Sequence, residues 1–137
     1  MEPRTKSIPT IPAKWVFGIK GNGQKKARLV VVGCRDTEIY SPNDKTSPTP
    51  SMDTTRWLLA HASHDKLNLV QIDVKCAFLQ ANIDRTKYIA LPPGVKGNPK
   101  TQVARLNRAL YGLAISPKCW YLRIDTFLTQ HGFERSC

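Results

Sequence analysis

One aspartate, Asp73, has surroundings in this 137-residue chain that suggest chemistry. It lies in the apolar run QIDVKCAFL, where an ionised carboxylate is costly unless it is paired with a cation or bound to a metal. Hard divalent cations take carboxylate oxygens as ligands, so an aspartate at a strand end is compatible with such a site. The same residue can instead bond to backbone amides or to Lys75, and on the residues alone this second interpretation is favoured.

The other residues able to do chemistry are scattered. His61, His64 and His131 have no Cys or Ser partner in a nucleophile setting. Asp84 is predicted to lie in a polar loop and Asp125 to face solvent on a helix, and no two acidic residues are adjacent. The four cysteines lack the C-x-x-C spacing of a metal site, which favours free thiols: Cys34, Cys76, Cys119 and Cys137.

Asp73 has to be positioned by the segments around it. Residues 67–74, LNLVQIDV, predict a central strand covered on both faces, and CAFLQ after it predicts a tight turn or short helical piece. Before it, a helix is predicted from Ser51 or Asp53 to about Asp65.

The N-terminal third predicts a β-hairpin. Residues 1–13 carry three prolines and no periodicity, and are interpreted as an arm. KWVFGIK alternates, Gly21-Asn22-Gly23 is typical of a turn, and KKARLVVVG is typical of the returning strand. Lys25, Lys26 and Arg28 then lie near the tip, which suits a phosphate contact or an ordinary exposed turn.

The C-terminal half predicts two strands and a helix. The strands are expected at 88–91 and 102–106. The helix is expected to begin with Ser116 as its cap and Pro117 at its first position, and to end at Gly132. The whole order, ββ–α–β–β–β–α, predicts an α+β fold.

The charge favours a polyanionic partner. The chain has 21 Lys and Arg against 10 acidic residues, a net charge of +11, with the excess before residue 36 and after residue 70. Nucleic-acid binding fits this distribution, although many basic proteins bind none. No apolar run is long enough for a membrane span and the N-terminus lacks a signal sequence, so a cytoplasmic or nuclear location is expected.

Several motifs in series resemble one family. QIDVKCAFL, the PPG after a short strand, and LYGL followed by SP and CWY resemble, in order and spacing, the reverse transcriptase domain of copia-type LTR retrotransposons. The resemblance runs from Lys14 to Phe133 and implies a partial fingers-and-palm fold over 14–137. It also implies nucleotidyl transfer by an RNA-directed DNA polymerase, with Mg²⁺, a template-primer and a dNTP as partners.

The resemblance also implies roles for single residues. Asp73 matches the catalytic aspartate that binds both magnesium ions, and Lys26 and Arg28 are alternative triphosphate contacts. The remaining nucleotide-binding candidates carried over are backbone, aromatic and glycine positions: Cys76, Ala77, Phe78, Tyr111 and Gly112. Phe78 sits where a bulky ring excludes a ribose 2′-hydroxyl, though the residue alone would be taken as core.

The chain departs from the family pattern in ways that affect activity. Ala114 and Ile115 replace a basic and a polar residue, GCRD at 33–36 lacks the usual aromatic, and Cys76 stands where Asn is common. Two-metal transfer needs carboxylates on both sides of the ions, but the Tyr-x-Asp-Asp hairpin that supplies them in the family is not found. The chain is therefore expected to be a truncated, polymerase-incompetent portion lacking the C-terminal polymerase half. The alternative is a non-enzymatic basic nucleic-acid-binding module.

Overall fold

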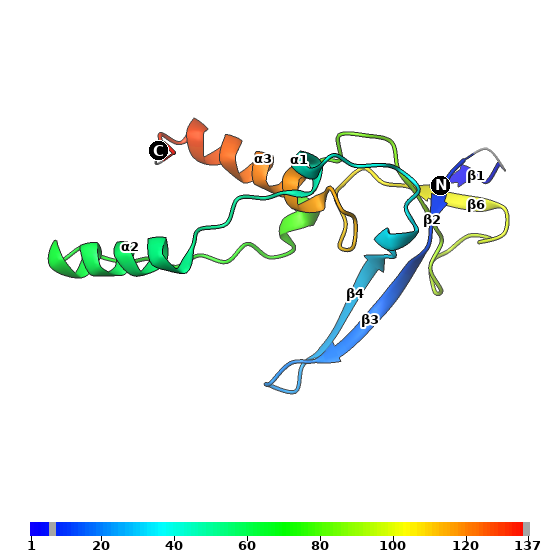
Figure 1. The fold of residues 1–137 in the computed structure, drawn as a ribbon. Helices are drawn as coiled ribbons and strands as arrows, with labels where there is room; N and C mark the ends of the chain where they lie inside the picture. The colour runs from blue at the N-terminus through cyan, green and yellow to red at the C-terminus, as the bar shows by residue number, and fades with distance from the viewer. Residues whose placement is uncertain (6–7, 136–137) are drawn as a thin grey trace.

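The computed structural model describes residues 1–5 and 8–135, and it combines helices and strands as the α+β prediction expects. Figure 1 shows a central body from which two parts project, a long β-hairpin and the helix α2 (Met52–His64). Within the described part of the chain, no helix is long and apolar enough to cross a membrane.

The body contains a four-stranded sheet in the order β1-β6-β5-β2. Its strands are β1 (Glu2–Pro3), β2 (Thr10–Ile11), β5 (Tyr88–Ala90) and β6 (Gln102–Arg105). Strands β5 and β6 confirm the two predicted C-terminal strands. Strands β1 and β2 lie in the N-terminal 13 residues, and their pairing with β6 and β5 ties this arm to the body.

The core lies where this sheet meets the base of the hairpin and the start of the last helix. Apolar burial therefore fixes the hairpin's base but not its tip. The buried cluster consists of Ile11, Val31, Ala81, Ile89, Ala109, Leu110, Leu113, Ile115 and Cys119.

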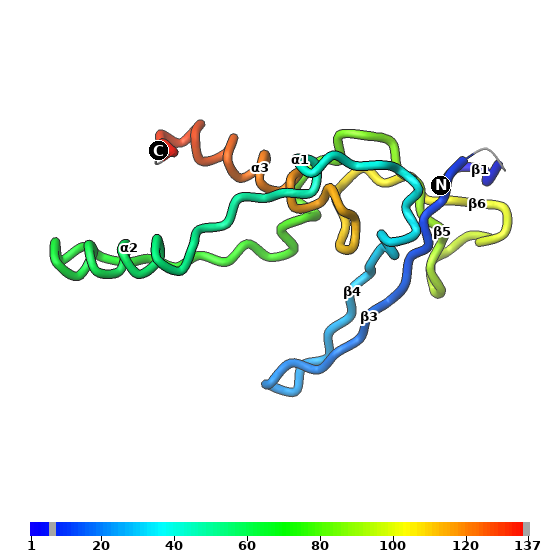
Figure 2. The backbone as a smooth tube through the Cα atoms, viewed as in Figure 1, coloured from blue at the N-terminus to red at the C-terminus, as the bar shows by residue number. Residues whose placement is uncertain are grey.

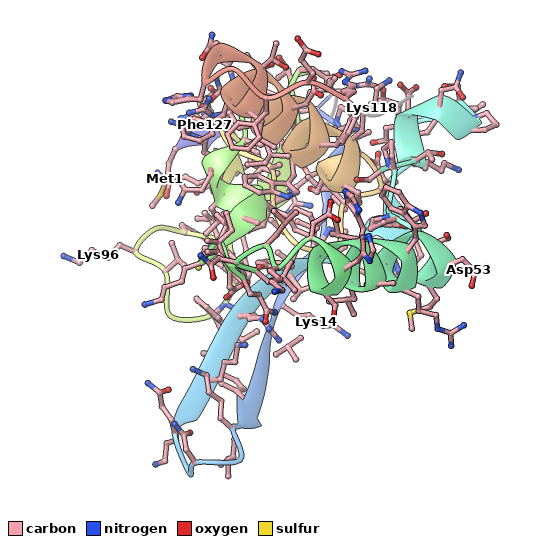
Figure 3. All side chains as sticks on the ribbon, turned by 90° about the vertical axis from the view of Figure 1, so that its left-hand side faces the viewer. Met1, Lys14, Asp53, Lys96, Lys118 and Phe127 are labelled. Carbon is pink, nitrogen blue, oxygen red and sulfur yellow. The ribbon has the colours of Figure 1, made fainter. Side chains whose placement is uncertain are left out.

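The hairpin is formed by β3 (Ala13–Ile19) and β4 (Lys25–Val31), which confirms the prediction. Val16 lies opposite Arg28 and Gly18 opposite Lys26, and directly opposed side chains share one face of a two-stranded ribbon. The other face carries Phe17 and Ile19, which are 75% and 77% exposed. Figure 3 shows that no other element covers the outer half of this ribbon.

Helix α2 begins where the sequence predicts, because Ser51 Oγ accepts a hydrogen bond of 3.1 Å from the Thr54 amide. Of its residues only Ala62 is buried. After the helix the chain runs back toward the body (Figure 2), and there the prediction of a central strand at 67–74 is wrong. These residues form no strand and all are exposed, Val70 by 84% and Ile72 by 78%. Their apolar pattern predicts burial, but no strand in the described part of the chain pairs with them.

The last helix, α3 (Ser116–Gln130), confirms the predicted helix with one change at its start. Ile115 is the N-cap, and the Ser116 hydroxyl donates instead to the Leu110 carbonyl at 2.6 Å. At the other end Gly132 has φ +84°, and the amide of Phe133 donates to Leu128. This is the glycine-terminated end that the sequence predicts.

The structure also contains three short helical pieces and three described cysteines. Besides η1 (Gly33–Arg35) and α1 (Pro42–Lys45), the structure has η2 (Ala77–Gln80), which confirms the short helical piece predicted after Asp73. Among the described cysteines all three are free, as predicted, while Cys137 lies outside the described residues.

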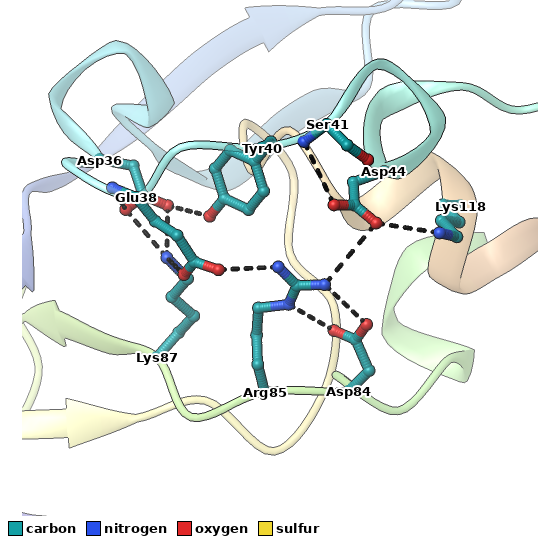
Figure 4. A network of polar contacts seen from close by, with 9 residues as sticks. All are labelled: Asp36, Glu38, Tyr40, Ser41, Asp44, Asp84, Arg85, Lys87 and Lys118. Carbon is teal, nitrogen blue, oxygen red and sulfur yellow. Dashed lines mark hydrogen bonds and ion pairs between the residues drawn. The ribbon is translucent and has the colours of Figure 1, made fainter.

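A network of ion pairs fastens the segment after the hairpin to the body, as Figure 4 shows. Lys87 Nζ lies 2.7 Å from Asp36 Oδ2 and 2.5 Å from Glu38 Oε2. The side chains of Lys87 and Asp36 are only 7% and 6% exposed, so each depends on the other for charge compensation. Burial opposes ionisation of Asp36, but hydrogen bonds from Lys87 and Tyr40 outweigh it and hold its pKa below the ordinary value.

The same network reaches α3. Arg85 lies 2.7 Å from Glu38 and 3.0 Å from Asp84, and Lys118 Nζ lies 2.9 Å from Asp44 Oδ1. The hydrogen bond from Lys118 lowers the pKa of Asp44 to about 2. The segment between the hairpin and α2 is thus held at Asp36 and Glu38 and again at Asp44.

We expect Lys87→Met to lower the free energy of unfolding by about 3–5 kcal/mol, because it leaves Asp36 buried without a cation. Lys45→Met, which removes an exposed lysine from the segment that Lys87 holds, should change it by less than about 0.5 kcal/mol. Denaturant unfolding at neutral pH measures both. Folding lowers the pKa of Asp36 and Glu38, so their contribution is lost as pH falls below 3.8 and 4.5, and the two variants should converge there. Equal stabilities of the two variants at neutral pH would show that the Lys87–Asp36 ion pair does not fasten this segment to the body.

Candidate functional site

The base of the hairpin lies directly against the turn that contains Tyr111 and Gly112. The Val31 amide donates to the Tyr111 carbonyl at 2.8 Å. A Cβ on Gly112 would overlap the Val31 carbonyl oxygen, and a Cβ on Gly33 would overlap the Gly112 carbonyl oxygen. Only glycines allow the two backbones to approach this closely.

This approach brings three of the predicted site residues together. The Arg28 guanidinium carbon lies 5.7 Å from the centre of the Tyr111 ring, within cation–π range. The Phe78 ring lies 4.9 Å from the same ring with an interplanar angle of 59°, a tilted aromatic pair. Phe78 and Tyr111 are half-buried and Arg28 is exposed, so the cluster opens to solvent on its cationic side.

Lys26 shares the face of Arg28 but lies two residues nearer the tip. Successive residues of one strand face are about 6.6–6.8 Å apart along the chain. Lys14, opposite Val30, belongs to the same face, which therefore carries three cations on one side of the hairpin. Within residues 1–5 and 8–135, no carboxylate forms an ion pair with any of them.

The structure does not bring Asp73 into the aromatic cluster. Asp73 is exposed, and it takes part in no hydrogen bond or ion pair within the described ranges. Its neighbours Cys76 and Ala77 lead into η2, with Cys76 in a left-handed conformation at φ +53°. Cys76 and Ala77 therefore connect the Asp73 segment to Phe78 along the chain.

The described side chains do not make up a magnesium site. No group of three or more His, Cys, Asp or Glu residues in the described part could hold a metal ion. Mg²⁺ requires near-octahedral oxygen ligation, and Asp73 offers one carboxylate. The residues present therefore do not fit the two-ion arrangement that the sequence resemblance implies.

Two ion pairs outside the aromatic cluster escaped sequence reasoning. The Lys87–Asp36 pair joins positions 51 apart, and no local pattern signals such a partner. Asp125, predicted to face solvent, lies at the surface, where Arg135 pairs with it at 2.6 Å and leaves its side chain 18% exposed. No local pattern signals this partner, which reaches the helix because the chain turns back at Gly132.

An apolar pocket of about 260 Å³ lies between the Asp73 segment and α3. Most of its lining comes from one helix face with spacing i, i+3, i+4 and i+7. The lining residues are Val74, Gln80, Trp120, Arg123, Ile124 and Phe127.

The family model and the individual relatives that this chain matches agree on one protein family. The family described as "Reverse transcriptase (RNA-dependent DNA polymerase)" matches residues 3–137. The Pol polyprotein of transposon TNT 1-94 from Nicotiana tabacum is 35% identical over 132 residues, which is 92% of this chain and 10% of that protein. The polyprotein of transposon RE2 from Arabidopsis thaliana is 31% identical over 98% of this chain, and again 10% of that protein.

A yeast relative agrees with the two plant proteins. The Gag-Pol polyprotein of transposon Ty1-DR4 from Saccharomyces cerevisiae is 32% identical over 124 residues, covering 88% of this chain and 7% of that protein. The chain thus spans about a tenth or less of the curated relatives it matches. No solved structure matches it.

We expect Gly112→Ala to destabilise the chain by about 1–3 kcal/mol more than Gly94→Ala. Gly94 has a similar positive φ, +85° against +92°, but a Cβ there meets nothing within 4 Å. Both variants carry the strain of a left-handed backbone, and only Gly112→Ala also pushes on the hairpin. Thermal or denaturant unfolding of the two proteins measures the difference. Equal losses would mean that the hairpin base does not rest on this turn.

Proposed function

Because the chain belongs to the copia-type reverse transcriptases, the RNA-dependent DNA polymerases of retrotransposons, we propose that it forms the fingers and the first part of the palm. Its role is to bind template-primer and the phosphates of a dNTP through the basic face of the hairpin. By itself it does not polymerise. The observation that carries the proposal is the cluster of Arg28, Tyr111 and Phe78, which combines a cation with two aromatic rings.

The chemistry of this face suits phosphates and bases. Lys26 and Arg28 carry charge that no carboxylate neutralises in the described part, and each phosphate that they contact releases counterions. Aromatic rings beside such cations provide stacking surfaces that tolerate any base. Phe78 is half-buried against Tyr111, a position compatible with packing on a nucleotide sugar.

Cys76, Ala77 and Gly112 enter the proposal through backbone groups. Cys76 and Ala77 open η2, and the first amides of a helix have no intrahelical partner. Gly112 supports the site because its missing side chain lets the hairpin backbone at Val31 pack against it. These roles follow from the positions that the family motif gives these residues.

Asp73 supplies one metal ligand of an active site that needs more. Reverse transcriptases generally use Mg²⁺, and two-metal transfer needs carboxylates at both ions. No second acidic motif accompanies Asp73, so other polypeptide has to provide the remaining ligands. Any Mg²⁺ affinity of this chain should therefore be weak, and its nucleic-acid affinity should not depend on Asp73.

The exposed segment at 67–74 is the surface on which that polypeptide would dock. Leu67, Leu69, Val70 and Ile72 are between 55% and 84% exposed, and the pocket against α3 continues the apolar surface. An added strand would satisfy the free backbone and cover these side chains. We therefore assign the docking partner as the remaining part of the polymerase domain.

The second candidate function is a basic nucleic-acid-binding module without catalysis. The net charge of +11 and the cationic hairpin face favour it. It differs from the first proposal in one respect: adding the rest of the polymerase domain in trans should restore no synthesis.

The purified chain should bind a template-primer with an affinity that falls steeply as salt rises, and it should extend no primer in Mg²⁺. Asp73→Asn should keep the dissociation constant within about twofold, whereas Arg28→Ala should weaken binding about tenfold and lower the salt slope by about 1. Arg56→Ala, which removes an equal charge from α2, is the matched control and should have little effect.

Three outcomes would contradict the proposal. Template-directed synthesis by the chain alone would show a more complete active site. A large loss of nucleic-acid affinity in Asp73→Asn would show the same for the metal site. Absence of binding at low salt would remove the nucleic-acid role altogether.

A further inference from the structure

Two sets of cations in the described part of the chain differ in the contacts that hold them. In the first, each cation is held by carboxylates: Arg85, Lys87, Lys118 and Arg135. In the second, on the hairpin face, no ion pair forms in the described part of the chain. Within this second group only Arg28 is held by a defined contact, the Tyr111 ring at 5.7 Å.

The Tyr111 ring is itself well fixed. The backbone carbonyl of Tyr111 accepts a hydrogen bond from the Val31 amide, and the centre of the Phe78 ring lies 4.9 Å from the centre of the Tyr111 ring. Gly112, the next residue, is locked against the hairpin backbone by the close approach that its missing side chain allows. The ring therefore has a set position relative to the strand that carries Arg28.

An arginine placed over an aromatic ring keeps its binding capacity. The guanidinium is planar, so it can stack by its face while its N–H donors, which lie in the plane, remain available for a bidentate phosphate contact. A side chain that is restricted by contact with a ring also loses less freedom on binding. Lys26 has neither a planar group nor a described partner, and it lies farther toward the tip.

We infer that Tyr111 is a positioning residue that holds Arg28 ready to bind phosphate groups, and that Arg28 rather than Lys26 is the principal phosphate-binding cation of the hairpin. This inference rests on the proposed function and sharpens it by choosing between the two cations. The ligand chemistry is a phosphate anion, carried by a free triphosphate or by a nucleic-acid backbone.

The test measures the affinity of the full chain for two probes, inorganic tripolyphosphate and single-stranded oligo(dT), at one low salt concentration. Tyr111→Leu and Arg28→Lys should each weaken binding of the phosphate probe about fivefold, the first by losing the ring and the second by losing the planar group. Tyr111→Phe keeps the ring and should bind as the wild type does. Lys26→Ala should have a clearly smaller effect than Arg28→Ala.

Tyr121→Leu is the matched control, because Arg135 lies over the Tyr121 ring at the same distance, 5.7 Å. It removes an equivalent cation–π pair elsewhere and should leave both affinities unchanged. The double variant Arg28→Ala/Tyr111→Leu should bind no more weakly than Arg28→Ala alone, because Tyr111 acts through Arg28. Arg28→Lys and Tyr111→Phe make the test independent of any folding defect in Tyr111→Leu.

The outcomes separate this inference from the proposed function. Failure of the wild type to bind either probe would overturn both. Binding by the wild type with Arg28→Lys unaffected, or with additive losses in the double variant, would overturn only the role of Tyr111. Loss confined to tripolyphosphate identifies the free triphosphate as the source of the phosphate, and loss for both probes identifies the backbone as well; either result supports the inference.

Discussion

The close approach of two backbones, at Gly33 and Gly112, is the constraint on which the candidate site depends. The hairpin carries the free cations and the turn carries Tyr111, and neither has a function in this account without the other. Their contact needs no side chain at either glycine, because a Cβ on each would overlap the other segment's backbone. This close approach lets the Val31 amide donate a hydrogen bond to the Tyr111 carbonyl, 80 positions away in the sequence. The contact between the hairpin base and the Tyr111–Gly112 turn thus sets the position of the strand that carries Arg28.

The ion-pair network supports the same arrangement from the other end of the segment. Lys87 holds Asp36 and Glu38 a few residues after the hairpin, and Lys118 holds Asp44 on the path to α2. The core beneath is small, and most large apolar side chains of α2 and of residues 67–74 remain exposed. The ion pairs therefore fix the position of a segment to which the small core offers few apolar contacts, and removing one partner leaves the other charge uncompensated. The exposed apolar side chains of residues 67–74 form the surface on which we propose that a further part of the polymerase domain docks.

Local patterns predicted the elements that local physics decides. Alternation and the Gly21-Asn22-Gly23 turn predicted the hairpin, and capping residues predicted α2 and the end of α3. Strands β1 and β2 escaped prediction because each has only two residues, too few to show an alternation of apolar and polar side chains. The strand at 67–74 was predicted from an apolar pattern, which records a need for burial but not whether a partner is at hand. The Lys87 network and the Arg28–Tyr111 contact depend on tertiary approach, so only the structure could reveal them.

Hydrogen exchange at the Val31 amide tests the central constraint most directly, because this amide bonds to the Tyr111 carbonyl across the contact. If the hairpin base rests on the turn, Val31 should exchange only through global unfolding, with an opening free energy equal to that of the whole chain. Amides near Gly23, at the tip, should exchange far faster. Exchange at Val31 as fast as at the tip would contradict the account, since Arg28 would then have no fixed place over Tyr111.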